Sequence, residues 1–176
     1  MRKFKFWYQR YIPIAVILLL GGLTIGIASV SAAGGAATSS ALPSEVSPGM
    51  GRQIEVAINV DLSKVKPPND KLGSFTGSLK WDPAVLAYKS DTGILAGFMG
   101  VVNTAKALSG QIALNGVNTK GAAGQITVLR ITFDVVGAGT SALDLTYSAM
   151  AAANTFADLR PLVKVKNSRV TVLKKK

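Results

Sequence analysis

The segment that decides the fold of this chain of 176 residues is Gly77–Ser90, which reads GSLKWDPAVLAYKS. Its first half alternates polar and apolar residues up to Trp81, which is the pattern of a β-strand with one buried face. Pro83 ends the strand, and it keeps Asp82 extended because a residue before proline avoids the helical region. We therefore expect Trp81 and Leu86 to point into the core from the two sides of this turn.

The same alternation extends on both sides of this segment, with turn residues between the runs. The alternating runs are Ile54–Val60, Phe75–Trp81, Leu129–Val135, Leu143–Tyr147, Val163–Lys166 and Arg169–Val172. Ile126 and Val128 are out of phase with the run that follows, which predicts a β-bulge or a strand start buried on both sides. Residues 103–108 and 148–159 also fit short helices. Many short strands separated by turns predict an all-β sandwich or jelly roll over residues 52–173.

The N-terminal segment has the composition of a targeting sequence. Four bases lie within the first ten residues, and residues 11–44 carry no charge. The apolar run 12–30 is about 19 residues long, enough to span a bilayer as a helix. Small residues up to Ala32 fit cleavage by a signal peptidase. Residues 1–32 are therefore predicted to form a hydrophobic helix, either a cleaved signal peptide or a retained signal anchor.

Both alternatives predict the same topology, with the basic end in the cytoplasm and the rest of the chain exported. The expected location is extracellular or at the cell surface, with membrane contact through residues 12–30 if the segment is retained. Residues 33–51 are small, polar and interrupted by proline, with one charge, and are predicted to be a flexible linker. Residues 174–176 form a basic tail of three lysines.

The composition excludes several kinds of chemistry. The chain has no cysteine and no histidine, which rules out disulfides, Cys/His metal sites, thiol nucleophiles and Ser-His-Asp catalysis. No pair of carboxylates is placed by the pattern as a glycosidase requires, so we expect no enzyme activity. The net charge of +11 is concentrated at the two ends of the chain. Together with the predicted export, this argues against a nucleic-acid partner.

Three patterns in the predicted domain resemble cohesin modules. The first is Trp81-Asp82-Pro83-Ala84-Val85-Leu86 at the end of a strand. The second is Gly110-Gln111-Ile112, followed downstream by Gly124-Gln125-Ile126 and Ile131-Thr132-Phe133. The third is the closing strand Ser168–Val172. The resemblance covers residues 52–173, nearly the whole predicted domain.

The resemblance implies a jelly-roll sandwich of about nine strands whose flat sheet face binds a dockerin. A dockerin is a small helical module with bound calcium on another protein, often a polysaccharide-degrading enzyme. The calcium belongs to the dockerin, so no cofactor is expected on this chain. In the family, the strand and turn around the Gly-x-Ile segment contribute to the binding face. The positions that match it here are Ala113, Asn115, Asn118 and Lys120. The family often has acidic residues nearby, whereas this chain has none between Asp91 and Asp134.

Two other functions compete with dockerin binding. A direct carbohydrate-binding module would bind a polysaccharide on exposed aromatic rings, for which Tyr88, Phe98 and Phe156 are the candidates. A pilin-like or envelope structural subunit would use the N-terminal helix as the core of a polymer. That class usually has a glycine before its cleavage point and a glutamate soon after it, but here no glycine precedes Gly21 and no glutamate precedes Glu45.

Overall fold

The computed structural model describes residues 37–174, which form ten β-strands and one short 3-10 helix, η1. The elements are β1 (Ala37–Pro43), β2 (Gln53–Asp61), β3 (Lys71–Lys80), β4 (Leu86–Asp91), β5 (Met99–Asn103), η1 (Ala107–Ser109), β6 (Gln111–Ala123), β7 (Gln125–Val135), β8 (Gly139–Ala152), β9 (Val163–Lys166) and β10 (Ser168–Val172).

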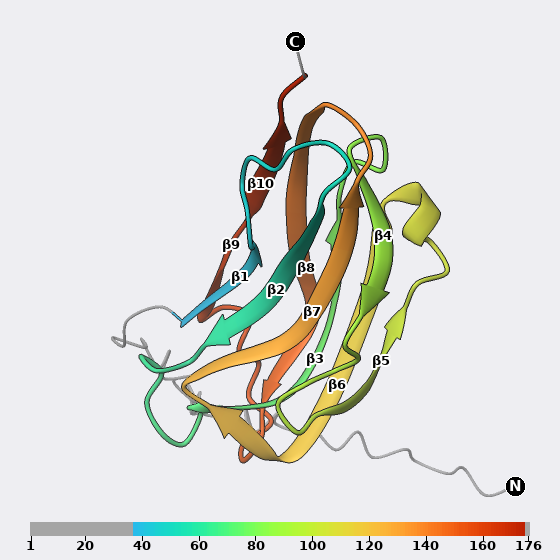
Figure 1. The fold of residues 1–176 in the computed structure, drawn as a ribbon. Coiled ribbons are helices and arrows are strands. Elements are labelled where there is room, and N and C mark those ends of the chain that lie inside the picture. The colour runs from blue at the N-terminus through green and yellow to red at the C-terminus, as the bar shows by residue number, and fades with distance from the viewer. Residues whose placement is uncertain (1–36, 175–176) are drawn as a thin grey trace, which may run out of the picture. The chain divides into compact units, whose positions relative to one another are not determined.

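The strands make two five-stranded sheets that face each other (Figure 1). The first sheet has the order β4-β7-β2-β1-β9, and the second has the order β10-β8-β3-β6-β5. Every pairing is antiparallel except that of β1 with β9, which is parallel. The predicted all-β sandwich is confirmed, with ten strands in the described residues where about nine were expected.

The core lies between the sheets and is built from the inward positions of the alternating runs. In β2, the residues from Ile54 to Val60 are alternately buried and half-buried. Aromatic pairs cross the core in edge-to-face geometry, with ring centroids 5.2 Å apart for Phe75 and Phe98. Such pairs contribute about 0.5–1.5 kcal/mol beyond the apolar area that they bury. The period-two pattern thus directs one face of each sheet into a shared apolar interior.

The turn after Trp81 is held as the sequence predicts. Trp81 and Leu86 are both buried, and the Trp81 ring packs edge-to-face on Phe133 at a centroid distance of 4.9 Å. The Asp82 carboxylate accepts a hydrogen bond from the Ala84 N–H at 2.9 Å. The Asp82 N–H donates to the Ser141 hydroxyl, also at 2.9 Å. This turn therefore links β3 to β8 of the same sheet and supports the core.

The predicted bulge lies at Val128 in β7. Leu129 is opposite Ile58 and Thr127 is opposite Asn59, so Val128 is the extra residue of β7 at this point of the ladder. Val128 and Leu129 are both fully buried, which explains why the apolar phase changes there. The irregular phase of this run in the sequence was therefore a correct indicator of a bulge.

The predicted linker over residues 33–51 is wrong for residues 37–43, which form β1 in the interior of the first sheet. Ala37, Ser39 and Ala41 are all buried. Their small side chains look like linker composition, yet all three occupy the inward positions of β1. The folded domain in the described residues therefore starts at or before Ala37 instead of at residue 52.

Two short helices suggested by the sequence are also replaced by other structure. Residues 148–152 continue β8, and of residues 103–108 only the last two belong to η1. No helix within residues 37–174 is long and apolar enough to cross a membrane. The predicted signal or anchor helix of residues 1–32 lies outside the described residues, as do the last two lysines of the tail.

Candidate functional site

The outer surface of the second sheet, which we call the second-sheet face, carries two of the four residues expected to contact a partner, Ala113 and Asn115. Outward side chains cross β8, β3, β6 and β5 in register, and so form rows. From one end to the other, the rows are Asp144–Lys80–Gln111, Thr146–Ser78–Ala113–Asn103, Ala149–Thr76–Asn115–Val101 and Ala151–Ser74–Val117–Met99. Because most of these side chains are small, the face is flat over its middle rows.

One end of the second-sheet face is apolar and open to solvent. Met99 is 73% exposed, Val101 60% and Val117 45%. Met99 lies directly opposite Val117, and Val101 is in the adjacent row. We call these three residues the apolar corner. Contiguous exposed apolar side chains are typical of surfaces that bind another molecule.

The middle of the face presents hydroxyl and amide groups. The Ser78 and Thr146 hydroxyls are 3.0 Å apart and share a hydrogen bond. The Asn115 Oδ1 accepts a hydrogen bond from the Val101 N–H at 3.3 Å, which orients the side chain and directs its NH₂ group away from that contact. This part of the face can therefore donate and accept hydrogen bonds without carrying charge.

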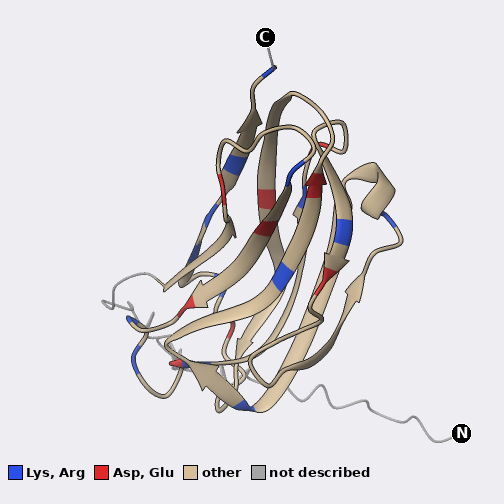
Figure 2. Ribbon diagram, in the orientation of Figure 1, with Lys and Arg blue, Asp and Glu red and all other residues tan. Residues whose placement is uncertain are grey.

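The charged residues of this sheet lie outside its middle rows. Lys80 and Asp144 share the row at the opposite end, and Arg169 is on β10 at the far edge. Figure 2 shows no charged residue on β5, and the one charge on β6 is Lys120, close to the end of that strand. A partner that docks on the apolar corner thus meets no charge within the corner itself, while Lys120 lies just beyond it at the same end of the sheet.

The structure separates the four predicted contact residues into two pairs. Ala113 and Asn115 lie on the face, in its second and third rows. The Asn118 Oδ1 instead accepts hydrogen bonds from the N–H groups of Lys120 at 3.0 Å and Gly121 at 3.1 Å. Its Nδ2 donates to the Ala96 carbonyl oxygen at 3.4 Å. Asn118 therefore holds an irregular segment of β6 together, while Lys120 is exposed beyond the last row.

Sequence reasoning missed the apolar corner. Met99, Val101 and Val117 are apolar residues in a β protein, and such residues are expected in the core unless the register is known. The signal that could have located Val117 is its phase, because it continues the outward positions of Ala113 and Asn115 along β6. The sequence gives no comparable signal for β5, because the strand is short and the glycines around it interrupt the alternation of polar and apolar residues.

The described residues offer neither an aromatic platform nor a metal site. Of the three rings proposed to stack on a sugar, Phe98 is buried and Phe156 is 83% exposed on its own turn. Tyr88 is half-buried, and its hydroxyl donates to Asp91 at 2.5 Å. Burial, followed by this hydrogen bond, raises the pKa of Tyr88 to about 12. Residues 37–174 contain no group of three or more acidic side chains arranged to hold a metal ion.

Comparison with known proteins identifies the fold. No protein-family model matches the sequence, and no curated protein matches it. Solved structures do match over most of the chain. A non-cellulosomal cohesin from the archaeon Archaeoglobus fulgidus aligns with a TM-score of 0.61 at 17% identity, covering 79% of this chain and 92% of its own.

Cohesins solved together with dockerins are similar as well. The sixth cohesin of scaffoldin B from Acetivibrio cellulolyticus, in complex with a dockerin, gives a TM-score of 0.62 at 12% identity, with coverage of 78% and 99%. A type I cohesin–dockerin complex from Clostridium thermocellum gives 0.58 at 14% identity, with coverage of 77% and 99%. The chain therefore has the cohesin fold, which agrees with the resemblance carried by the Trp81–Leu86 segment.

Proposed function

We propose that this chain is a non-catalytic, cohesin-like module that binds a dockerin-bearing protein through the second-sheet face. The observation that carries the proposal is the cohesin fold, because cohesins of this fold have been solved in complex with dockerins. Cohesin domains are binding modules without catalytic activity. On this reading, any calcium required for binding belongs to the dockerin partner.

The composition of the second-sheet face supports its choice over the opposite face. Protein–protein interfaces combine an apolar centre with a polar rim, and charged side chains are depleted at the centre. The apolar corner, with the hydroxyls and amides beside it, matches that description. On the outer face of the first sheet, by contrast, Leu42 is the one large apolar residue among the exposed large hydrophobics of residues 37–174.

The proposal includes export of the module to the extracellular space or cell surface. Its support is the N-terminal sequence alone, where a basic start precedes a long apolar run. Export would place the module where dockerin-bearing, polysaccharide-degrading enzymes work. It would also leave the domain attached to the membrane if residues 12–30 were retained as an anchor.

The test is binding of the purified full-length chain to recombinant dockerins encoded by the same organism, with and without calcium. We expect at least one dockerin to bind in a calcium-dependent manner. V101K should weaken that binding by tenfold or more, because a charge would be buried at the apolar corner. The matched control is T132K, which places the same charge on an outward position of β7 in the other sheet.

Two results would contradict the proposal. If no dockerin of the organism binds in the presence of calcium, the dockerin-binding function is wrong. If binding occurs but is lost in T132K and kept in V101K, the module binds through the first sheet instead. Substitution of Asn115 by Ala is a milder test of the middle rows, for which we expect a smaller loss.

A further inference from the structure

The outer face of the first sheet, which we call the first-sheet face, differs in chemistry from the second-sheet face. Two rows of polar side chains cross β9, β1, β2 and β7. They are Lys164–Thr38–Asp61–Gln125 and Lys166–Ser40–Asn59–Thr127. The next row starts with the apolar pair Leu42 and Ala57. No part of the proposed dockerin-binding function uses these residues.

A shallow depression with a volume of about 440 Å³ lies over the two polar rows. Its polar lining residues are Thr38, Ser40, Asn59, Asp61, Gln125 and Thr127, and Leu42 lines it as well. By register, Lys164 and Lys166 border Thr38 and Ser40 on the β9 side. A volume of a few hundred cubic ångströms is in the range of small-ligand sites.

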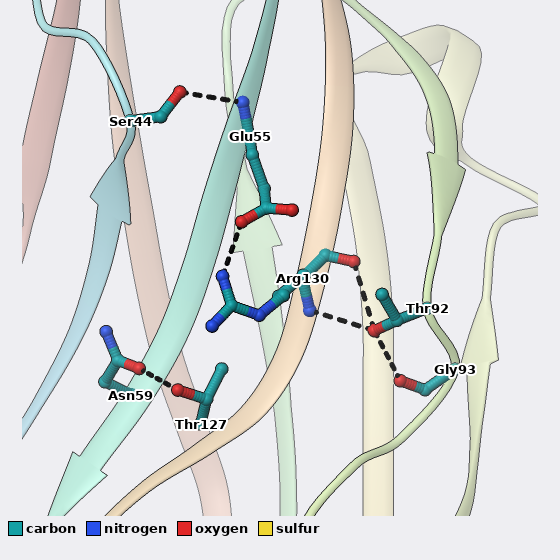
Figure 3. A network of polar contacts seen from close by, with 7 residues as sticks. All are labelled: Ser44, Glu55, Asn59, Thr92, Gly93, Thr127 and Arg130. Atoms are coloured by element: carbon teal, nitrogen blue, oxygen red, sulfur yellow. Dashed lines mark hydrogen bonds and ion pairs between the residues drawn. The ribbon is translucent and has the colours of Figure 1, made fainter.

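The polar groups of the depression are oriented by one another. The Thr127 hydroxyl donates to the Asn59 Oδ1 at 2.7 Å (Figure 3), which fixes the amide so that its NH₂ group remains to donate elsewhere. The Gln125 Nε2 donates to the Asp61 Oδ2 at 3.2 Å, which leaves the Gln125 Oε1 as an acceptor. Preorganised groups lose less side-chain entropy when a ligand binds.

Asp61 supplies the one carboxylate in the lining. The hydroxyl and backbone N–H of Ser63 both donate to its Oδ1, and these bonds hold the pKa of Asp61 below its usual value. The carboxylate is therefore ionised at neutral pH, where it repels an anion placed in the centre of the depression. It is also a strong acceptor for hydroxyl donors.

The lining selects among classes of ligand. An apolar ligand or lipid chain would leave the hydroxyl, amide and carboxylate groups without partners, which is unfavourable. An anion would meet Asp61. A neutral ligand with many hydroxyl groups can pair with both donors and acceptors and can pack the C–H side of a ring on Leu42, which is 50% exposed. The two bordering lysines add further donors for its hydroxyls.

We propose that this depression is a binding site for a neutral oligosaccharide segment, on the sheet opposite the proposed dockerin-binding face. The described part of the chain offers no stacking platform of several exposed aromatic rings, so binding relies on hydrogen bonds and is weak, with a Kd of about 1 mM. The module would thus contact a polysaccharide surface with one sheet while the other holds a protein partner.

The test is NMR titration of the ¹⁵N-labelled full-length chain with neutral β-1,4-linked hexasaccharides of glucose, xylose and mannose. We expect saturable shifts for at least one of them, centred on Ser40, Asn59 and Thr127. S40A combined with N59A should weaken binding by about tenfold. The matched control, S78A, removes a hydroxyl from the second-sheet face and should leave the affinity unchanged.

Each outcome decides the proposal. Shifts centred on the second-sheet face, or an affinity unchanged in the S40A/N59A double variant, would overturn it. So would the absence of saturable shifts with all three hexasaccharides up to about 10 mM. Because the dockerin test uses other ligands and the opposite face, the glycan site can fail without affecting the proposed partner binding, and the reverse also holds.

Discussion

The hydroxyl of Tyr147 on β8 lies 2.9 Å from the hydroxyl of Ser39 on β1, so a hydrogen bond joins the two sheets through the core. Ser39 also donates to the carbonyl oxygen of Asn59 on the neighbouring strand at 2.8 Å. Ser39 is 1% exposed. These contacts fix β1, a strand with few large side chains, against both its own sheet and the opposite one.

Removal of the Tyr147 hydroxyl and removal of the Ser39 hydroxyl should destabilise the domain by different amounts. Y147F deletes one hydroxyl and should reduce the free energy of unfolding by about 1 kcal/mol. S39A should cost more, about 1–3 kcal/mol, because it leaves both the Tyr147 hydroxyl and the Asn59 carbonyl without this partner. Urea unfolding of the single and double variants measures the coupling. Additive losses would mean that the two hydroxyls do not interact.

Alkaline pH should weaken the fold through the same tyrosine. Burial raises the pKa of Tyr147 to about 12, with the Ser39 hydrogen bond acting in the opposite direction. The folded state therefore favours the neutral phenol, so its contribution is complete below pH 10 and is lost as the pH rises towards 12. The loss should be on the order of 2 kcal/mol.

Urea midpoints at about pH 9 and pH 11.5 test this dependence. Y147F should lose less stability between the two values than the unsubstituted chain. The pKa of Tyr88 is also raised to about 12, so Y88F should likewise lose less stability than the unsubstituted chain, and the Y147F/Y88F double variant should lose the least. Equal alkaline losses in Y147F and in the unsubstituted chain would show that other groups cause the transition.

Two glycines allow steric crowding to be separated from backbone strain. Gly110 and Gly124 have φ angles of 76° and 72°, so alanine at either position is strained by about 1 kcal/mol. A Cβ on Gly110 would lie 2.3 Å from the Trp81 carbonyl oxygen, whereas a Cβ on Gly124 would meet nothing within 4 Å. G110A should therefore be more destabilising, by about 3 kcal/mol in total against about 1 for G124A. Similar thermal shifts for the two variants would contradict this reading of the turn beside Trp81.

Phe156 has an exposed ring and an unfavourable backbone conformation. Its φ angle is 57°, in the left-handed region that bulky residues rarely adopt. F156N should raise the free energy of unfolding by about 0.5–1 kcal/mol, because asparagine tolerates this region and no buried contact is lost. Thermal unfolding of the variant measures the gain. A decrease would mean that the ring packs on the domain in solution.

The sequence predicts most strands because large apolar residues alternate in them, and it even locates the bulge at Val128. It fails at β1, where Ala37, Ser39 and Ala41 fill inward positions. Small residues carry almost no periodic signal, so pairing with β2 and β9, and not local propensity, makes this segment a strand.

The candidate site was predictable where β6 keeps its alternation and not beyond that point. Ala113 and Asn115 follow the period of two and lie on the second-sheet face. At Asn118 the ladder with β3 becomes irregular, as the pairing moves from Val117 opposite Ser74 to Ala122 opposite Leu72. Whether Met99 and Val101 point outward depends on how β5 pairs with β6. That pairing joins residues that are distant in the sequence.

The pairing of Ala37 with Val163 also constrains how the domain is made. Synthesis produces β1 first, yet its parallel neighbour β9 and the last strand, β10, come at the end of the chain and form one edge of each sheet. A nascent chain that stops before residue 163 therefore exposes two unprotected sheet edges at once, which favours aggregation. Completion of both sheets must therefore await β9 and β10, so a chain that ends before residue 163 should be less stable and more prone to aggregate.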